Sequence, residues 1–271
     1  MNKVSFLDGD DSVLYRIFPF YSNGIAMDGV YWGMTLKAAG SMRFRWNEVN
    51  SVRDAMLMKI ANSFAGKIPV PVQLDHTKIV YRVDSANDTY QKIGDGIITQ
   101  NKSLMPVVTV ADCVPVYLYA PDTGYFGVVH SGWKGTGIVA EAIEMMVTGG
   151  AARNGICVAI GAHIRDCCYV VNEERAEYFS REFTVECVKK IEEGEELCKG
   201  APSNWNNGGG RLYRLSLFKA NLVLLEKAGI KEQNITYADE CTCCNSIFGS
   251  NRRETSMGSE FTVQAAFTLK L

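Results

Sequence analysis

A cysteine and a histidine stand in two neighbouring apolar runs near the middle of the chain. Residues 107–135 read VVTVADCVPVYLYAPDTGYFGVVHSGWKG, with Cys113 in the first run and His130 at the end of the second. The whole chain has only three histidines, so one beside a thiol in an apolar segment needs an explanation. A Pro-Asp-Thr-Gly turn separates the runs, and the stretch therefore predicts a β-hairpin that carries both side chains.

The register of this hairpin decides whether the two side chains meet. If the Asp-Thr pair forms the tip, Pro115 faces His130 and Cys113 faces Gly132. Cys113 and His130 are then diagonal neighbours on one face of the sheet, with backbones about 7–8 Å apart. A slip of one residue would place them on opposite faces. The expected separation suits a bridging metal ion or a thiol–imidazole hydrogen bond.

Two kinds of chemistry fit such a pair. In one, His130 takes the proton of Cys113 and generates a thiolate nucleophile. In the other, both side chains bind zinc, and His76, which follows an extended run, supplies the third ligand. Three protein ligands with one open position are the arrangement of a catalytic zinc site. The alternative is structural: Cys113 packs as a small core residue and His130 is a hydrogen-bonded histidine at a strand end.

The residues around the pair allow further roles. Asp112 either orients an imidazole or caps a turn. The glycine-rich loop 131–137 leads into a predicted helix, whose free amides attract anions, and Lys134 would add charge; the alternative is a tight turn. Arg252 and Arg253 either bind an anion or form a solvated pair. The loop lacks the pattern of a nucleotide-triphosphate phosphate loop.

The sequence CTCC at 241–244 raises the question of a structural metal site. The chain has no second cysteine pair of matching spacing, and the adjacent Cys167 and Cys168 are awkward as joint ligands. The sequence by itself therefore argues against zinc there.

The elements that must position these residues alternate between helices and strands. We predict short strands within 1–48, strands at 68–72, 79–83, 97–99, 157–160, 235–237 and 261–267, and helices at 47–65, 138–147, 172–183, part of 184–198 and 215–229. This order predicts an α/β or α+β fold. The only linker-like stretch, 202–210, is too short to divide domains, so we expect a single domain over 1–271.

Composition narrows the class of protein. The chain of 271 residues is 47% hydrophobic and 21% charged, with a net charge of −2, which gives no reason to expect nucleic-acid or membrane binding. No run approaches the roughly 18 apolar residues of a spanning helix. The N-terminus has no apolar signal-peptide core, and nine cysteines are odd in number and dilute. We expect reduced thiols in a cytoplasmic protein.

Several motifs together resemble one known family. Thr109-Val-Ala-Asp-Cys113-Val-Pro and His130-Ser-Gly-Trp-Lys-Gly135 resemble signatures of the YfiH family, also called the laccase-domain or multicopper polyphenol oxidoreductase family. Further matching segments are 95–99, 160–169, 215–221, 241–242 and 248–253, so the resemblance covers residues 70 to 267. The family's Gln-x-His-Gly motif is altered to Gln73-Leu-Asp-His76-Thr.

The resemblance implies a fold, a site and a set of reactions. It implies mixed sheets flanked by helices, as in cytotoxic necrotizing factor toxins, and zinc bound by His76, Cys113 and His130. It implies a zinc-dependent enzyme that phosphorolyses purine nucleosides or deaminates adenosine, with Cys113, His130 and Asp112 in the catalytic site. Phosphate would lie near Lys134 or Arg253. The alternatives are a copper-dependent polyphenol oxidase acting on phenols, and a metal-free Cys–His hydrolase like the toxins.

Overall fold

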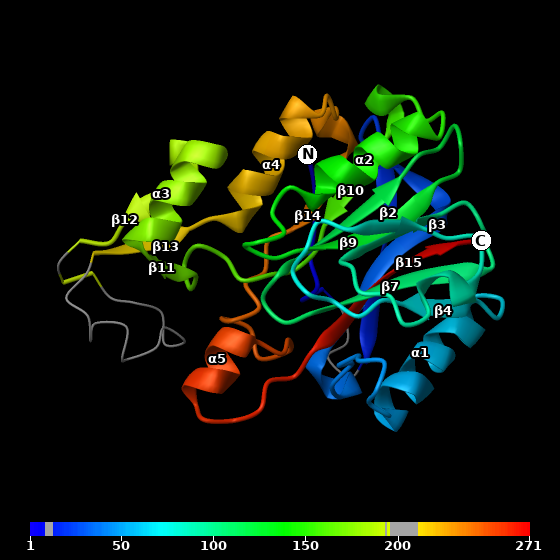
Figure 1. Cartoon of the computed structure of the whole chain (residues 1–271), viewed down its shortest axis with the longest axis horizontal. Helices are drawn as coiled ribbons and strands as arrows, with labels where there is room; N and C mark the ends of the chain where they lie inside the picture. The colour runs from blue at the N-terminus through cyan, green and yellow to red at the C-terminus, as the bar shows by residue number, and fades with distance from the viewer. Residues whose placement is uncertain (9–12, 193, 196–210) are drawn as a thin grey trace.

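Two large β-sheets stacked face to face form the centre of the molecule, and helices cover their outer faces (Figure 1). The computed structural model describes residues 1–8, 13–192, 194–195 and 211–271. The predicted linker-like stretch 202–210 lies outside the described residues. The predicted mixed α/β class is confirmed.

The first large sheet has seven strands in the order β1-β14-β10-β8-β9-β6-β5. Its central pairs, β10 with β8, β8 with β9 and β9 with β6, are antiparallel, and its outer pairs are parallel. The strands are β1 (Asn2–Val4), β5 (Val80–Arg82), β6 (Gly96–Thr99), β8 (Val114–Tyr119), β9 (Phe126–Ser131), β10 (Cys157–Ile160) and β14 (Ile235–Ala238).

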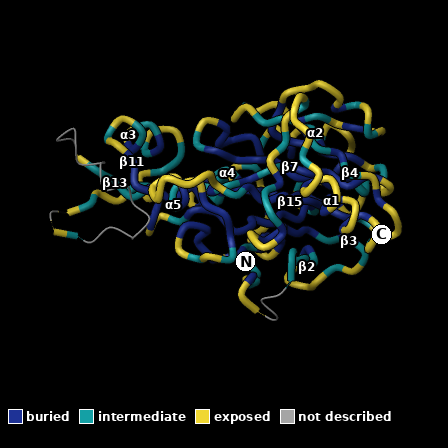
Figure 2. Tube along the Cα trace, turned by 90° about the horizontal axis from the view of Figure 1, so that it is seen from below, coloured by how far each residue is buried: buried dark blue, intermediate teal, exposed yellow. Residues whose placement is uncertain are grey.

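The second large sheet has the order β2-β3-β15-β7-β4. Its strands are β2 (Tyr15–Ser22), β3 (Ile25–Thr35), β4 (Ile68–Pro71), β7 (Leu104–Val110) and β15 (Gln264–Lys270). A small third sheet, β11-β13-β12, lies with α3 at one end of the long axis (Figures 1 and 2). Its strands are β11 (Val170–Asn172), β12 (Val188–Lys190) and β13 (Leu212–Leu215).

The described part of the chain contains five α-helices and five short 3-10 helices. The α-helices are α1 (Ser51–Ser63), α2 (Ile138–Thr148), α3 (Glu173–Glu182), α4 (Leu217–Lys227) and α5 (Asn251–Ser256). The 3-10 helices are η1 (Lys37–Ala39), η2 (Ala86–Thr89), η3 (Arg153–Gly155), η4 (Val185–Cys187) and η5 (Glu232–Asn234). No helix in the described ranges is long and apolar enough to cross a membrane.

Side chains that cap helices explain several of the helix starts. The side chains of Asn50, Asn172, Ser216 and Ser250 each accept a hydrogen bond from a backbone N–H of the first turn of α1, α3, α4 and α5. Helix α2 differs, because its N-cap is Gly137 and has no side-chain cap.

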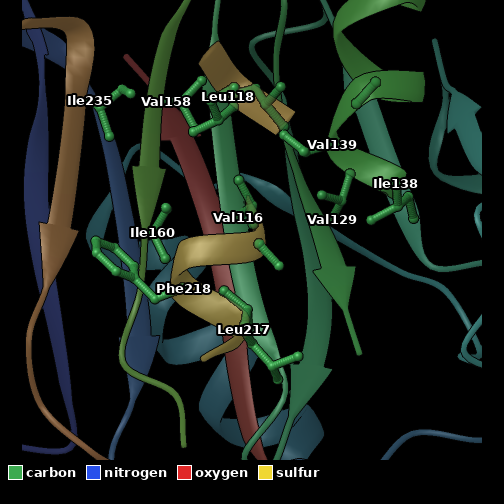
Figure 3. Close-up of a cluster of buried hydrophobic side chains, with 14 of the residues drawn as sticks. Val116, Leu118, Val129, Ile138, Val139, Val158, Ile160, Leu217, Phe218 and Ile235 are labelled. Atoms are coloured by element: carbon green, nitrogen blue, oxygen red, sulfur yellow. The ribbon is translucent and has the colours of Figure 1, made fainter. Parts of the chain in front are cut away.

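Alternation along the central strands divides the core into three layers. In β8, Val116 and Leu118 face helices α2 and α4, whereas Tyr117 and Tyr119 face the second sheet. Figure 3 shows the first of these layers, in which side chains of β8, β9 and β10 meet those of the two helices. The third layer lies between β15 and α1. Burial on both faces explains why these strands are continuous apolar runs in the sequence.

The structure differs from two sequence expectations about elements. Part of 184–198 was expected to be helical, and among its described residues the helical part is limited to the short 3-10 helix η4, which the edge strand β12 follows. Cys113 was expected within a strand, but it lies in the bend between β7 and β8, because Asp112 has a φ of 80°. The left-handed conformation interrupts the ladder and separates what looked like one run into two strands.

Close strand contact at Gly127 gives a stability prediction. A Cβ there would fall on the carbonyl oxygen of Ile97 and the Cα of Ile98 in the neighbouring strand, so Gly127→Ala requires the backbone to shift. We expect it to lower the free energy of unfolding by about 1–3 kcal/mol or more, as in overpacked cores. Urea unfolding followed by tryptophan fluorescence measures the change.

The matched control is Gly155→Ala, because a Cβ at Gly155 meets nothing within 4 Å. Its free energy of unfolding should stay within about 0.5 kcal/mol of the wild type. Equal destabilisation by both substitutions would contradict the strand contact.

Candidate functional site

His76, Cys113 and His130 converge on one point. The hairpin has the predicted register, with Pro115 opposite His130, and Cys113 directly precedes β8. The side-chain donor atoms of the three residues all lie within 4.8 Å of one another. The Cys113 Sγ is 3.9 Å from the His76 Nε2, and the two imidazole rings are 4.8 Å apart in an edge-on arrangement.

A buried carboxylate, Asp95, holds both histidines. Its Oδ1 accepts hydrogen bonds from the His130 Nδ1 at 2.8 Å and from the His76 backbone N–H at 3.0 Å. Its Oδ2 accepts from the Thr77 backbone N–H and hydroxyl, both at 2.7 Å. The bond to Nδ1 turns the other ring nitrogen of His130 toward the thiol, as the partners of metal-binding histidines do. Asp95 therefore positions two of the three donors.

Local backbone structure explains how these segments approach one another. Asp95 directly precedes β6, and its carbonyl accepts from the His130 N–H at 2.7 Å, which continues the β6–β9 ladder. His76 has a φ of 56°, a conformation uncommon for residues other than glycine, and the hydrogen bonds to Asp95 hold its loop in place. The site thus combines two strand ends with one constrained loop.

The glycine-rich loop packs directly against the donors. A Cβ at Gly132 would lie 2.8 Å from the His76 Cδ2 and 3.2 Å from the Cys113 Sγ. A Cβ at Gly135 would lie 2.7 Å from the Thr77 carbonyl oxygen. These glycines therefore allow the loop to approach the site closely. The Thr136 hydroxyl donates to the Gly132 carbonyl at 2.8 Å and closes the loop.

Neighbouring charges change the ionisation of the pair. Burial alone would raise the pKa of the Cys113 thiol, but His130 and His76 lower it to about 6. Burial alone would lower the pKa of His130, but the Cys113 thiolate and the Asp95 carboxylate raise it to about 10. In metal-free protein the pair is therefore a thiolate and an imidazolium near neutral pH.

The donor set fits a zinc ion. Two imidazoles and one thiolate are ligand types that zinc prefers, and the close approach allowed by Gly132 keeps them within 4.8 Å. The hydrogen bond from His130 to Asp95 is the outer contact that such ligands usually make. His76 is exposed, Cys113 is half-buried and His130 is buried, so the donors are reached from one side.

The three donors line a cavity of about 680 Å³, within the range of small-molecule sites. Four arginines contribute to its walls, together with three aromatic rings, and these lining residues are Arg43, Arg45, Arg175, Arg252, Phe44, Tyr169 and Phe261. The cavity therefore offers positive charge and ring faces beside the thiol–imidazole group.

The other nominated residues lie around this centre. The Asp112 carboxylate, which also lines the cavity, accepts hydrogen bonds from Thr242 at 2.6 Å, Ser250 at 3.0 Å and the Arg252 backbone N–H at 2.6 Å. Burial raises the pKa of the Asp112 carboxyl above its ordinary value, although these hydrogen bonds act to lower it. Asp112 thus connects the bend before Cys113 to the C-terminal loop.

The two nominated cations make different contacts. The Lys134 ammonium lies 5.5 Å from the centre of the Trp133 ring, whose face also carries the Arg175 guanidinium at 4.0 Å. The Arg253 guanidinium donates to four backbone carbonyls of the loop that precedes α5, those of Thr242, Cys243, Asn245 and Phe248. Arg253 therefore orders the C-terminal loop, while its neighbour Arg252 lines the cavity.

The third histidine lies apart from this site. His163 is fully buried, stacks on Phe218 and donates from its Nδ1 to the Gly161 carbonyl at 2.7 Å. Burial lowers its pKa to about 4, so it is neutral. A histidine-rich cluster of several coppers would need more imidazoles than the two that converge here.

The central role of Asp95 and three of the four cavity arginines, Arg43, Arg45 and Arg175, were not predicted from the sequence. Asp95 was noted only at the start of a strand within a family motif. Its signal was its place one residue before β6, the strand beside His130. Arg43, Arg45 and Arg175 come from segments distant in sequence, so no spacing rule connects them to the thiol.

The chain is similar to proteins of one known family. A family model described as multi-copper polyphenol oxidoreductase laccase matches residues 47–265. Purine nucleoside phosphorylase YlmD of Geobacillus stearothermophilus is 32% identical over 164 residues, 59% of this chain and 55% of that protein. Adenosine deaminase RL5, from an unknown prokaryotic organism, is 30% identical over 173 residues, 62% of this chain and 60% of that protein.

A solved structure is similar over most of the chain. The crystal structure of the hypothetical protein YfiH of Bacillus licheniformis has a TM-score of 0.74 and 27% identity, covering 89% of this chain and 93% of that one. The sequence matches to the two named enzymes, by contrast, span little more than half of the length of each.

The charge pairing predicts the reactivity of the thiol. In protein stripped of metal with a chelator, the rate at which iodoacetamide alkylates Cys113 should rise as the pH increases through about 6, because the lowered pKa makes the thiolate available there. In His130→Ala the rise should move toward the ordinary thiol value of 9.0. Mass spectrometry of the Cys113 peptide gives the rates, and an unchanged midpoint in the variant would contradict the pairing.

Proposed function

The chain belongs to the multi-copper polyphenol oxidoreductase laccase family, and from its site we propose that it is a zinc-dependent enzyme acting on purine nucleosides. The reactions proposed are phosphorolysis of adenosine, inosine and methylthioadenosine, and deamination of adenosine. The names of the relatives support this choice, since those compared are called purine nucleoside phosphorylase and adenosine deaminase.

The observation that carries the proposal is the convergence of two imidazoles and one thiol at the cavity wall. Their donor atoms lie within 4.8 Å of one another, and one carboxylate, Asp95, fixes both histidine segments. When zinc is bound by these residues, it supplies a positive charge that polarises the attacking phosphate or water. The protein's part is to hold the donors without rearrangement, which the Asp95 hydrogen bonds support.

The side chains that line the cavity are of the types that bind the two substrates of a phosphorolysis, a purine nucleoside and phosphate. In this reaction the bond between the purine and the sugar breaks, a phosphate oxygen bonds to the sugar carbon, and the base leaves with a proton. We assign the purine to the ring faces of Phe44, Tyr169 and Phe261, and the phosphate to the cavity arginines. Lys134, the other cation considered for phosphate, contacts Trp133 and is not among the lining residues. Arginines bind phosphate through paired N–H groups. We prefer Arg252 because it lines the cavity and its guanidinium donates to the backbone carbonyl of Val170, whereas the Arg253 guanidinium donates to four backbone carbonyls.

A metal-free Cys–His hydrolase is the second candidate. The contact chain from Asp95 through His130 to Cys113 has the order of a carboxylate, base and nucleophile, and the pKa values of about 10 for His130 and 6 for Cys113 favour the charged pair. A thiolate that binds zinc is not free to attack a substrate, so the two functions exclude each other at this site.

An assay with adenosine tests the proposal. The full chain, purified without added metal, should release adenine only when phosphate is present and should form inosine without phosphate. Removing zinc with a chelator should abolish both activities, and zinc should restore them. Failure of the zinc-loaded protein to convert adenosine, inosine or methylthioadenosine would disprove the proposal. Full activity under chelation would favour the hydrolase, and phenol oxidation that needs copper would favour an oxidase.

Because Asp95 accepts hydrogen bonds from both histidine segments, one conservative substitution of it should strongly reduce zinc affinity and activity. Asp95→Asn keeps the size of the side chain but loses the charge that accepts hydrogen bonds from the His130 ring and the His76 loop. Outer partners of metal ligands typically contribute a factor of about 10–100 in metal affinity or activity. We therefore expect kcat/KM for adenosine and zinc affinity to fall by about that factor.

The matched control is Asp28→Asn, the same change at an exposed position in β3. It should leave both quantities unchanged. A variant at Asp95 with normal zinc affinity and activity would refute the positioning role of this carboxylate.

A further inference from the structure

Four cysteines from two distant segments form a second group of thiols. Cys167 and Cys168 follow β10, and Cys241 and Cys244 follow β14. Their sulfur atoms all lie within 4.8 Å of one another. Cys168 and Cys241 are buried, and Cys244 is exposed. The His76–Cys113–His130 site uses none of these residues.

The sulfur separations match those of a tetrahedral zinc site. Zinc binds cysteine sulfur at about 2.3 Å, so four sulfurs at the corners of a tetrahedron are about 3.8 Å apart. The sulfur of Cys167 lies 3.7 Å from that of Cys168 and 3.7 Å from that of Cys244, and Cys168 and Cys244 are 3.3 Å apart. All four are free thiols, beyond the roughly 2.05 Å of a disulfide bond.

Two turns bring the four sulfurs together. They remove the reason for which the sequence argued against a zinc site at these cysteines. Because Cys167 and Cys168 are adjacent in sequence, they were expected to be awkward as joint ligands. Here they lie in a turn, in which the backbone N–H groups of Cys168 and Tyr169 both donate to the Arg165 carbonyl at 2.9 Å. The turn places both sulfurs on one side.

The second turn contributes the other two sulfurs. Cys241 and Cys244 have the Cys-x-x-Cys spacing of zinc-binding turns, and the Asn245 N–H donates to the Cys241 carbonyl at 3.1 Å. A parallel β-bridge between His163 and Cys241 joins the two turns, with the Thr242 N–H donating to the His163 carbonyl at 3.1 Å. The separation of the two turns is therefore fixed by backbone hydrogen bonds.

Positive charge and N–H donors surround the sulfurs, as a site of four thiolates requires. The Arg165 backbone N–H donates to the Cys241 Sγ at 3.3 Å. The Arg214 guanidinium donates to the Cys167 carbonyl at 2.7 Å, and the Arg253 guanidinium donates to the Cys243 carbonyl at 2.9 Å. Four thiolates exceed the charge of one zinc ion by two. The Arg165 N–H offsets part of this charge directly, and the Arg214 and Arg253 guanidiniums, which also pair with Glu195 and Glu254, contribute less.

We propose that Cys167, Cys168, Cys241 and Cys244 bind a structural zinc ion that joins the loop after β10 to the loop after β14. Four cysteine ligands fill the tetrahedral coordination of zinc and leave no position for a substrate, so the role is structural. An iron–sulfur cluster is larger than a single ion and needs its cysteine sulfurs farther apart than this compact group places them.

The joined loops form one wall of the cavity. Ile164 and Tyr169, on either side of the first turn, and Arg252, after the second, all line it. The second loop also carries Thr242, which binds Asp112 beside Cys113 at 2.6 Å. A zinc ion at the four cysteines would thus hold the cavity wall in place without contact with the reacting atoms.

Metal content and X-ray absorption of Cys113→Ser test the proposal independently of enzymatic activity. This substitution removes a donor of the first site and leaves the four cysteines intact. Purified under reducing conditions without added metal, the variant should retain about one zinc ion per chain. Its X-ray absorption spectrum should show four sulfur neighbours at about 2.3 Å. The result does not depend on whether the protein acts on nucleosides.

A second variant and a control complete the test. Cys241→Ser with Cys244→Ser should lose about one zinc ion per chain relative to the wild type, whereas Cys157→Ser, which changes a buried thiol outside both groups, should lose none. If the double variant does not fold, the X-ray absorption spectrum of Cys113→Ser still shows whether four sulfurs bind the zinc ion. The proposal is overturned if Cys113→Ser lacks zinc, if its zinc has nitrogen or oxygen neighbours, or if iron or disulfides occupy the four cysteines.

Discussion

The buried carboxylate of Asp95 is the constraint on which the candidate active site depends. A carboxylate without exposure to water must have hydrogen-bond donors, because an unsatisfied buried charge is costly. Here the donors are supplied by the residues of the site: the His130 ring, the His76 backbone and Thr77. The requirement to satisfy one charge therefore fixes the ring nitrogen that His130 presents and holds the His76 loop in its left-handed conformation.

The stacked sheets make this arrangement rigid. Strands β8 and β9 are buried on both faces, between two helices and a second sheet, and Asp95 precedes the strand next to β9. Cys113 and His130 thus stand at the ends of strands that have little freedom to move. His76, Arg43 and Arg45 come from loops, whereas Arg175 and Arg252 lie in the first turns of α3 and α5.

Asp112 connects the segment that carries Cys113 to the group of four cysteines. Its backbone carbonyl accepts from the Ile164 N–H at 3.0 Å, and its side chain binds Thr242, Ser250 and the Arg252 N–H. The residue before Cys113 is thereby attached to both loops that carry the four cysteines. From the sequence, Asp112 was expected to orient an imidazole or to cap a turn. Its observed hydrogen bonds connect the segment before Cys113 to the cavity wall.

Alternation and turn residues are local signals, so the mixed α/β class, the hairpin and its register could be predicted from the sequence. With the family motifs it also led to His76, Cys113 and His130. Three features became visible in the folded chain alone. Asp95 lies between the two histidines, and Arg252 rather than Arg253 lines the cavity. Cys167 and Cys168 lie beside Cys241 and Cys244. These contacts join segments far apart in the chain, and the side-chain directions within turns depend on backbone angles that residue spacing does not encode.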